Sequence, residues 1–250
     1  MKLRVSVLQQ CMGALLAAGV LLCAQPAQAG PVPAGTIWYN GDYDNRDALV
    51  NQTGANAGRV YDDFILSSTT QLTGVFSDNF IRSNNFTTAS WEIRSGVSSG
   101  NGGTLIASGD GAASRTSTGR STNFGGFFVY NELQVLVNIP TLTLGPGTYW
   151  LSVTPDTSDV SGAGTNSLLS TTSGANAIGT PPGNDGNSFI TSSFFGYNFT
   201  AVSDPSVEGQ GTWDFSMGVV AVPEPSGLAL AMAQIGTLGG FAVLRRRRRK

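Results

Sequence analysis

Three carboxylates that could act together as metal ligands lie close in the sequence: Asp42, Asp44 and Asp47. They belong to the stretch 40–47, Asn-Gly-Asp-Tyr-Asp-Asn-Arg-Asp, and oxygen ligands spaced in this way can converge on a hard cation such as Ca²⁺. The stretch does not fit the EF-hand pattern, because Asn45 stands where that loop requires glycine and Asn51 where it requires glutamate. We therefore expect either a solvated loop after the first strand or a Ca²⁺ site formed by the loops of a β-sandwich.

Two adjacent carboxylates, Asp62 and Asp63, follow Tyr61 in a strand-like run. A pair of carboxylates about 5–9 Å apart can hydrolyse a glycosidic bond. Neighbouring residues of a strand point to opposite faces of the sheet, so these two cannot form such a pair with each other. We expect one of them to pair with Arg59 or to cap a turn.

Three aromatic side chains are candidates for stacking on sugar rings: Trp91, Tyr149 and Trp150. Large aromatic side chains also supply much of the buried area of a β-sandwich, so a place in the core is the alternative for each of them. Alternation along the strand places one of the neighbouring rings Tyr149 and Trp150 inward and the other outward. An outward ring on a concave face would be a sugar-binding platform.

The residue types missing from the chain exclude several kinds of enzyme. Histidine is absent, and both cysteines, Cys11 and Cys23, precede residue 30. A domain that begins there has no cysteine nucleophile, no Ser-His-Asp triad and no Cys/His zinc site. We predict no catalytic residues and no cofactor, with Ca²⁺ as the one candidate ion.

The charge of the stretch 30–221 also limits its partners. It carries six arginines and fifteen acidic residues, which gives a net charge of −9. A strongly acidic domain is repelled by phosphate backbones, so we expect no nucleic-acid partner.

The same stretch, 30–221, is predicted to fold as one all-β domain, a β-sandwich of jelly-roll type. Short runs of β-branched and aromatic residues recur between turn-forming clusters, and no segment has a sustained helical period. A sandwich is favoured because an open sheet would leave its edge strands exposed. The expected strands are Thr36–Asn40, Arg59–Leu66, Gln71–Phe76, Ala89–Arg94, Thr104–Ala107, Phe127–Ile139, Gly147–Thr154, Phe189–Asn198 and Thr212–Val219. The polar stretch 158–186 is expected to be a flexible loop.

Residues 1–29 have the three parts of a secretory signal peptide: a basic start, an apolar run over about 11–24 and a small-x-small cleavage motif. The residues that mark the cleavage site are Ala27, Ala29 and Gly30. A lipoprotein signal ending at Cys23 is disfavoured, because Leu22 is large where that processing prefers a small residue. A retained N-terminal helix is disfavoured by the short apolar run. We expect export through the Sec translocon and cleavage by signal peptidase, with Gly30 as the first residue of the mature chain.

The segment 222–250 consists of three parts in a fixed order. The first is a stiff polar hinge made of Val222, Pro223, Glu224, Pro225 and Ser226. The second is the uncharged run 227–244, which as a helix would be about 27 Å long and would just span a hydrocarbon core of about 30 Å. The third is a basic cluster, Arg245, Arg246, Arg247, Arg248, Arg249 and Lys250. The positive-inside rule keeps this cluster in the cytoplasm, so the domain would lie on the other side of the membrane.

This order resembles the PEP-CTERM sorting segment of Gram-negative and related bacteria. The resemblance is carried by Pro223, Glu224, Pro225, the span 227–244 and the basic cluster 245–250, about a tenth of the chain. It implies recognition by exosortase, a membrane protease, during export to the cell surface or to the extracellular polysaccharide matrix. An ordinary membrane anchor with a Pro-containing linker is the alternative.

Three functional hypotheses follow from these observations. The first is a non-catalytic bacterial surface or matrix protein, held briefly in the inner membrane with its C-terminus cytoplasmic and associated with exopolysaccharide in a biofilm. The second is a carbohydrate-binding module assisted by Ca²⁺. The third and weakest is a polysaccharide hydrolase.

Overall fold

The computed structural model describes residues 30–82, 85–124, 128–158, 165–181, 185–207 and 211–222. The predicted signal peptide (1–29) and the segment 223–250 lie outside these residues, and so does the predicted membrane span. Among the residues that are described, no helix has the length and apolar character needed to cross a membrane. The elements are thirteen strands: β1 (Thr36–Tyr39), β2 (Tyr43–Val50), β3 (Arg59–Leu66), β4 (Thr70–Ile81), β5 (Thr88–Ser95), β6 (Thr104–Thr122), β7 (Tyr130–Leu144), β8 (Gly147–Pro155), β9 (Ser167–Thr172), β10 (Phe189–Ser192), β11 (Tyr197–Ala201), β12 (Asp214–Phe215) and β13 (Met217–Ala221).

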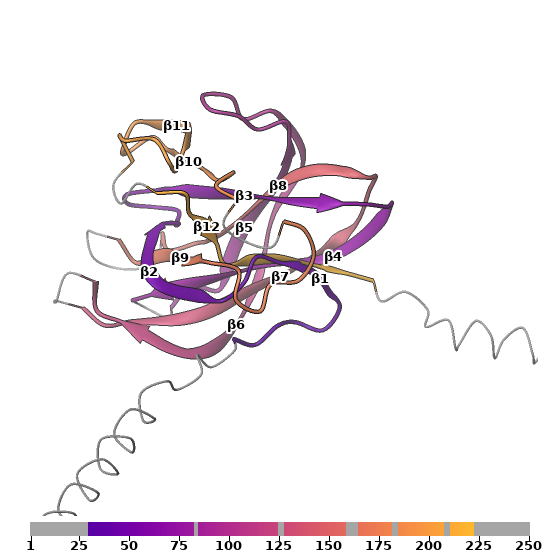
Figure 1. Cartoon of the computed structure of the whole chain (residues 1–250). Helices are drawn as coiled ribbons and strands as arrows, with labels where there is room; N and C mark the ends of the chain where they lie inside the picture. The colour runs from indigo at the N-terminus through magenta and orange to yellow at the C-terminus, as the bar shows by residue number, and fades with distance from the viewer. Residues whose placement is uncertain are drawn as a thin grey trace, which may run out of the picture.

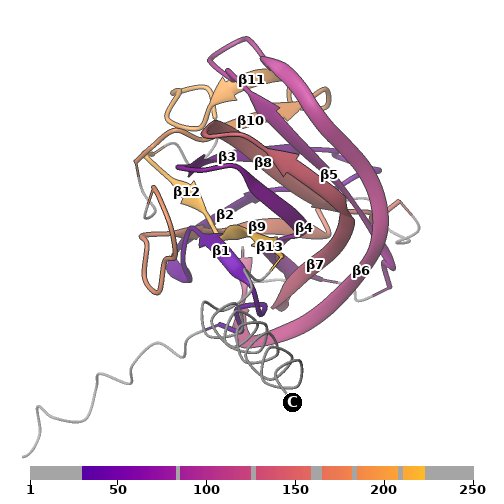
Figure 2. The same cartoon turned by 90° about the vertical axis from the view of Figure 1, so that its right-hand side faces the viewer.

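The strands form one antiparallel sheet that curls over on itself like half of a barrel (Figures 1 and 2). Its main order is β1-β13-β4-β7-β6-β5-β8-β3-β10-β11, and β9 joins beside β4 and also pairs with β2 and β12. Figure 2 shows the curl from its end, with β6 as the long curved strand along the outside. The prediction of an all-β fold is confirmed.

The long strand β6 links the two halves of the curled sheet. Its first half pairs with β5 and its second half with β7. The sequence predicted only Thr104–Ala107, because the rest of β6 consists of small and polar residues without apolar alternation. Two glycines explain how such a strand packs: a β-carbon on Gly109 would lie 3.2 Å from the Trp91 indole nitrogen, and one on Gly111 would lie 2.6 Å from Val137 Cγ1. These glycines therefore leave room for large side chains of the neighbouring strands.

The main hydrophobic core lies inside the curl, between β4, β7 and β13 on one side and β3, β5 and β8 on the other. Along β7, Val135 and Val137 are fully buried, whereas Asn138, between Val137 and Ile139, is exposed. The two halves also touch through a polar contact, because the Ser77 hydroxyl of β4 donates to the Val153 carbonyl oxygen of β8 at 3.1 Å.

A second, smaller cluster covers the outer face of β3 and β8. It contains Tyr61, Val97, Trp150 and Phe189, with Phe199 packed against it. The hairpin formed by β10 and β11 lies over this face (Figure 1). The sequence predicted a single strand over Phe189–Asn198, but a turn at Gly196, where φ is +78°, separates the two strands.

Two predicted loops contain strands, so these predictions are wrong. The stretch 40–47 was expected to be a loop, but most of it belongs to β2, which pairs with β9 across a register shift between Tyr43 and Ala48. The stretch 158–186 contains β9, whose polar side chains are buried and hydrogen-bonded; Ser170 Oγ, for example, donates to Glu132 Oε1 at 2.5 Å. A polar strand inside a protein has no apolar periodicity, so this strand could not be predicted from the pattern of its residues.

Candidate functional site

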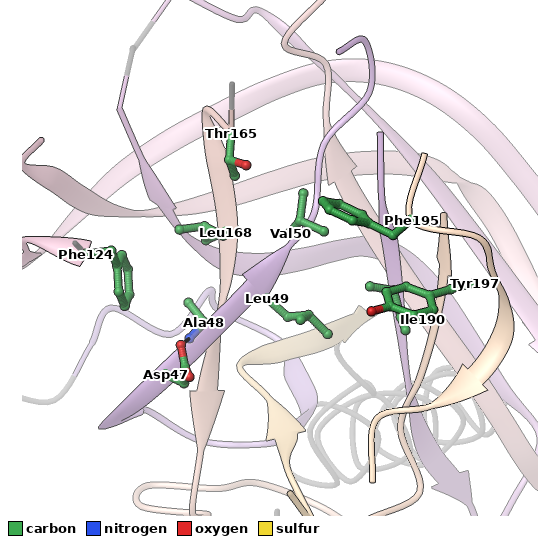
Figure 3. A pocket seen from close by; sticks show the side chains of 10 residues that line it. All are labelled: Asp47, Ala48, Leu49, Val50, Phe124, Thr165, Leu168, Ile190, Phe195 and Tyr197. Carbon is green, nitrogen blue, oxygen red and sulfur yellow. Dashed lines mark hydrogen bonds between the residues drawn. The ribbon is translucent and has the colours of Figure 1, made fainter. Parts of the chain in front are cut away.

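A cleft of about 280 Å³ opens between β2, β9 and the β10–β11 hairpin. Figure 3 shows its lining, with Phe195 and Tyr197 on one side and Phe124 on the other. Its lining side chains are Asp47, Ala48, Leu49, Val50, Phe124, Thr165, Leu168, Ile190, Phe195 and Tyr197. The volume lies near the lower end of the range of about 300–1,000 Å³ that is typical of small-molecule sites.

The hairpin wall of the cleft is aromatic. Phe195 is 41% exposed and packs nearly parallel to Tyr197, with ring centroids 6.0 Å apart and planes at 22°. The Phe195 amide donates to Ser192 Oγ at 3.2 Å, and the Tyr197 hydroxyl donates to the Ser206 carbonyl oxygen at 2.8 Å. These bonds fix the hairpin, so both rings are held in place before any ligand binds. Phe194, next in the chain, is 62% exposed and does not line the cleft.

The opposite wall is held by an aromatic cluster. Phe124 packs edge-on against Phe80, with centroids 5.4 Å apart, and against Tyr130 at 5.8 Å. The floor between the two walls is apolar and comes from three strands: Leu49 of β2, Leu168 of β9 and Ile190 of β10. The cleft therefore combines apolar and aromatic surface with few polar groups.

Asp47 supplies a carboxylate to this lining. Its Oδ1 atom accepts the Ala48 amide at 2.8 Å, and its carbonyl oxygen accepts the Thr171 hydroxyl at 2.8 Å. These bonds fix the backbone of β2 beside β9 and orient the carboxylate at the cleft. Of the three acidic residues singled out in the stretch 40–47, Asp47 is the one that lines it.

The other two carboxylates of that stretch have partners elsewhere. Asp42 is 2% exposed and accepts hydrogen bonds from the Tyr39 hydroxyl at 2.8 Å and from Asn176 Nδ2 at 2.6 Å. Asp44 forms a 2.5 Å ion pair with Arg46. Within the part of the chain that the structure describes, no three acidic, cysteine or histidine residues are grouped as metal ligands.

The three aromatic residues singled out in the sequence lie away from the cleft and against other side chains. Trp91 is 6% exposed in the main core, and Trp150 is 7% exposed in the outer cluster, where its indole nitrogen donates to the Asn187 carbonyl oxygen at 3.1 Å. Tyr149 is half-buried against Phe64. The two rings at 149 and 150 do point to opposite faces, but the hairpin covers the outer one.

The adjacent carboxylates Asp62 and Asp63 lie within the fold. Asp62 is fully buried and accepts hydrogen bonds from Asn40 Nδ2 at 2.9 Å and from the Phe215 amide at 2.6 Å. Burial and the neighbouring Asp214 raise the pKa of Asp62 well above its ordinary value. The expected partner of this pair, Arg59, instead forms a 3.5 Å ion pair with Glu92.

Asp63 is 3% exposed, and its Oδ1 atom has no hydrogen-bond partner among the described residues. Burial, followed by the charges of Asp185 and Asp214, raises the pKa of Asp63 to about 7. Both members of the Asp62–Asp63 pair are thus enclosed by protein rather than presented to a substrate.

The aromatic residues of the cleft are the ones that sequence reasoning missed. The available signal is the run 194–197, Phe-Phe-Gly-Tyr, in which a glycine turn follows two exposed phenylalanines and precedes a half-buried tyrosine. The prediction of one continuous strand over Phe189–Asn198 hides this signal, because every second ring of such a strand would be buried.

Comparisons of this chain with protein-family models, with curated proteins and with solved structures found no match. Of the predicted sorting motif, only Val222 lies within the described residues; its side chain is 42% exposed, and its amide donates to the Gln71 carbonyl oxygen at 2.9 Å.

Proposed function

We propose that this chain is an exported, non-catalytic protein of the bacterial surface or extracellular matrix whose β domain binds polysaccharide in the cleft of Figure 3. The observation that carries the binding role is the cleft itself, in which aromatic side chains stand over an apolar floor beside one carboxylate. Sugar rings offer apolar C–H faces that pack on aromatic rings and hydroxyl groups that donate to carboxylates. Phe195 and Tyr197 would supply the faces and Asp47 the acceptor.

The charge of the domain narrows the class of polysaccharide. A net charge of −9 over 30–221 repels acidic polymers at low ionic strength. A neutral or amino-sugar-containing exopolysaccharide is therefore the proposed ligand. Its chain would pass over the cleft, and single sugar rings would enter it.

Export and sorting are proposed from the two end segments. The signal-like segment 1–29 would direct the chain through the Sec translocon to signal peptidase, and the segment 222–250 would present it to an exosortase-type protease. In the folded domain, β1 and β13 pair, and the Ala221 amide donates to the Gly35 carbonyl oxygen at 3.0 Å, so the chain enters its first strand beside the end of its last strand.

The finer architecture is also a proposal. The curled sheet would act as a jelly-roll-like sandwich, since β4 and β8 face one another across the core. In a sandwich of this kind, a ligand cleft at the side of the molecule is built by loops and hairpins on a rigid scaffold.

A Ca²⁺-assisted carbohydrate-binding module is the second candidate, because Asp47 carries a carboxylate in the cleft. The two candidates differ in one measurement: binding of the exported protein to a panel of neutral, amino-sugar and acidic polysaccharides, in Ca²⁺ and again in chelator. Equal saturable binding in both conditions supports the first candidate, and binding lost in chelator supports the second. No binding to any polymer in either condition would refute the binding role and leave export as a separate proposal.

Export itself is tested by fractionating cells that express the full chain. A processed protein at the surface or in the medium is expected. Unprocessed protein found only in the inner membrane would contradict the sorting proposal.

A further inference from the structure

The carboxyl groups of Asp42, Asp78 and Glu132 are buried close to one another, and Tyr39 of β1 contacts the first two. Asp42 and Glu132 both contact Arg120, at 3.2 Å to Nη2 and 2.8 Å to Nη1 respectively. Asp78 receives hydrogen bonds from the hydroxyl groups of Tyr39, at 2.9 Å, and Ser216, at 2.7 Å. All three carboxyls are at most 2% exposed, and the Oδ1 atom of Asp78 has no hydrogen-bond partner among the described residues.

The cluster of Asp42, Asp78, Glu132 and Arg120 has more acidic than basic groups. Burial, followed by the charge of Glu132, raises the pKa of Asp78 to about 7. A buried carboxylate is costly unless positive charge and hydrogen bonds compensate it. The guanidinium of Arg120 supplies one positive charge to three acidic groups, so a second cation at this place would stabilise the folded state.

The backbone nitrogen of Gly30 lies beside this cluster, where such a cation would be needed. It is buried and donates to Asp42 Oδ1 at 3.1 Å. A β-carbon on residue 30 would lie 2.9 Å from that oxygen and 3.4 Å from Arg120 Nη1, so the position leaves no room for a side chain. The chain that follows is also fixed, because Gln134 Nε2 donates to the Pro31 carbonyl oxygen and Thr36 Oγ1 donates to the Pro33 carbonyl oxygen at 2.6 Å.

We propose that cleavage of the Ala29–Gly30 bond creates an α-ammonium group at Gly30 that forms a buried ion pair with Asp42 and so completes the fold of the mature protein. This inference rests on the proposed export, which supplies the cleavage. In the cleavage, water adds across the amide: its hydroxyl goes to the Ala29 carbonyl carbon, and its proton goes to the Gly30 nitrogen as the C–N bond breaks. That amine then takes up a second proton from solvent and becomes an ammonium group.

Processing therefore changes the chemistry at one atom. Before cleavage, the nitrogen of Gly30 is a neutral amide with one proton to donate. After cleavage it is a cation with three protons, still beside the Asp42 carboxylate and close to the rest of the cluster. A charge-assisted hydrogen bond is stronger than a neutral one, so the mature domain should be more stable and its N-terminus more rigid than in the precursor.

The test uses the reactivity of amines, for which this chain is well suited. Lysine occurs only at positions 2 and 250, so a mature chain that starts at Gly30 and is otherwise intact has two amines. An ordinary α-amino group has a pKa of about 7.7–8.0 against about 10.4 for lysine, and therefore reacts first with an acylating reagent near pH 8. In the folded protein we expect the reverse order, because the Gly30 amine is buried and held as an ammonium group.

The full chain is expressed with its own signal segment in a Sec-competent host, and the intact mass of the purified protein gives the mature N-terminus. It is then treated with acetic anhydride at pH 8, folded and in concentrated urea, and the labelling of each amine is followed by peptide mapping. The Gly30 amine is expected to react at least tenfold more slowly than the Lys250 amine when folded, and faster than it in urea. The variant Asp42→Asn should restore fast labelling, and Asp44→Asn, two residues further along the chain and paired with Arg46, should not.

A second variant covers the case in which Asp42→Asn does not fold. One alanine inserted between residues 29 and 30 moves the amine about 3.8 Å along the chain from Asp42, so it should label quickly and lower the melting temperature. A chain that begins elsewhere than Gly30 overturns the inference at the cleavage step. A chain that begins at Gly30 with a freely reactive folded amine overturns the ion pair while leaving export intact.

Discussion

Replacing Asp63 by asparagine should make the protein more stable at neutral pH and leave its stability unchanged in acid. Asp63 lies on β3, and its Oδ1 atom has no hydrogen-bond partner within the described ranges of the chain. Its pKa is raised from an ordinary value of 3.8 to about 7 by burial and by two nearby aspartates. The folded protein therefore holds a proton between these two pH values that the unfolded chain releases.

The size and sign of the effect follow from this difference. Stability falls as pH rises wherever the folded state binds more protons than the unfolded state. The stability is lost between about pH 4 and about pH 7, the pKa values of Asp63 in the unfolded and folded states. Over these roughly three pH units, at about 1.4 kcal/mol each, the free energy of unfolding falls by up to about 4 kcal/mol. Asparagine has a similar shape and no charge, so Asp63→Asn avoids this cost. The variant should equal the wild type near pH 4 and exceed it by about 2–4 kcal/mol at pH 8.

Urea denaturation at pH 4, 5, 6, 7 and 8 measures the difference directly. The matched control is Asp110→Asn on β6, whose side chain is exposed, and its effect should stay within about 0.5 kcal/mol at every pH. A difference for Asp63→Asn that does not grow with pH, or a variant less stable than the wild type at pH 8, would refute the reasoning.

Three further substitutions probe the main core, the long strand β6 and the buried cluster of Asp42, Asp78, Glu132 and Arg120. Leu151→Ala removes a fully buried side chain and should cost about 2–5 kcal/mol in urea denaturation, whereas Leu105→Ala, at 46% exposed, should cost little. Gly111→Ala places a β-carbon 2.6 Å from Val137 and should lower the free energy of unfolding by about 1–3 kcal/mol. The double variant with Val137→Ala should recover part of this loss, whereas simple additivity of the two effects would argue against direct contact. Tyr39→Phe removes a hydroxyl that reaches two buried carboxyl groups and should lower the melting temperature by several degrees; an unchanged value would show that the hydroxyl is dispensable.

The fold class and most of the apolar strands could be predicted from the sequence. Runs such as Arg59–Leu66 and Gly147–Thr154 are rich in β-branched and aromatic side chains, which is typical of a strand. The predictions on β3 and β7 worked because each of these strands packs one row of side chains into a single core.

The polar strands could not be predicted, because their stability comes from partners distant in the sequence. Most of the side chains of β9 are buried and polar, and hydroxyls from this strand donate to Glu132 and to Asp44, the latter at 2.7 Å. In β6, the apolar run ends at Ala107, and Gly109 and Gly111 then leave room for Trp91 and Val137 of the neighbouring strands. Neither role leaves a periodic pattern along the strand itself.

The candidate site was predicted in part. Asp47 was singled out and lines the cleft, but as a single carboxylate among aromatic rings. Trp150 would be exposed if nothing packed on the outer face of β8, but Phe189 of β10 and the backbone at Asn187 contact its ring. A periodic pattern shows to which face a side chain points, but not whether another segment covers that face.

The proposed polysaccharide cleft is tested most directly by two neighbouring phenylalanines on one hairpin. Phe195 lines the cleft, whereas Phe194 is more exposed and lies outside it. The polysaccharide that binds the wild type most tightly in the panel is used as the ligand. Its affinity is measured by titration calorimetry for the wild type, Phe195→Ala and Phe194→Ala. We expect Phe195→Ala to weaken binding about tenfold, or about 1.4 kcal/mol, and Phe194→Ala to change the affinity by less than about twofold. Equal affinities for all three proteins, or a loss confined to Phe194→Ala, would contradict it.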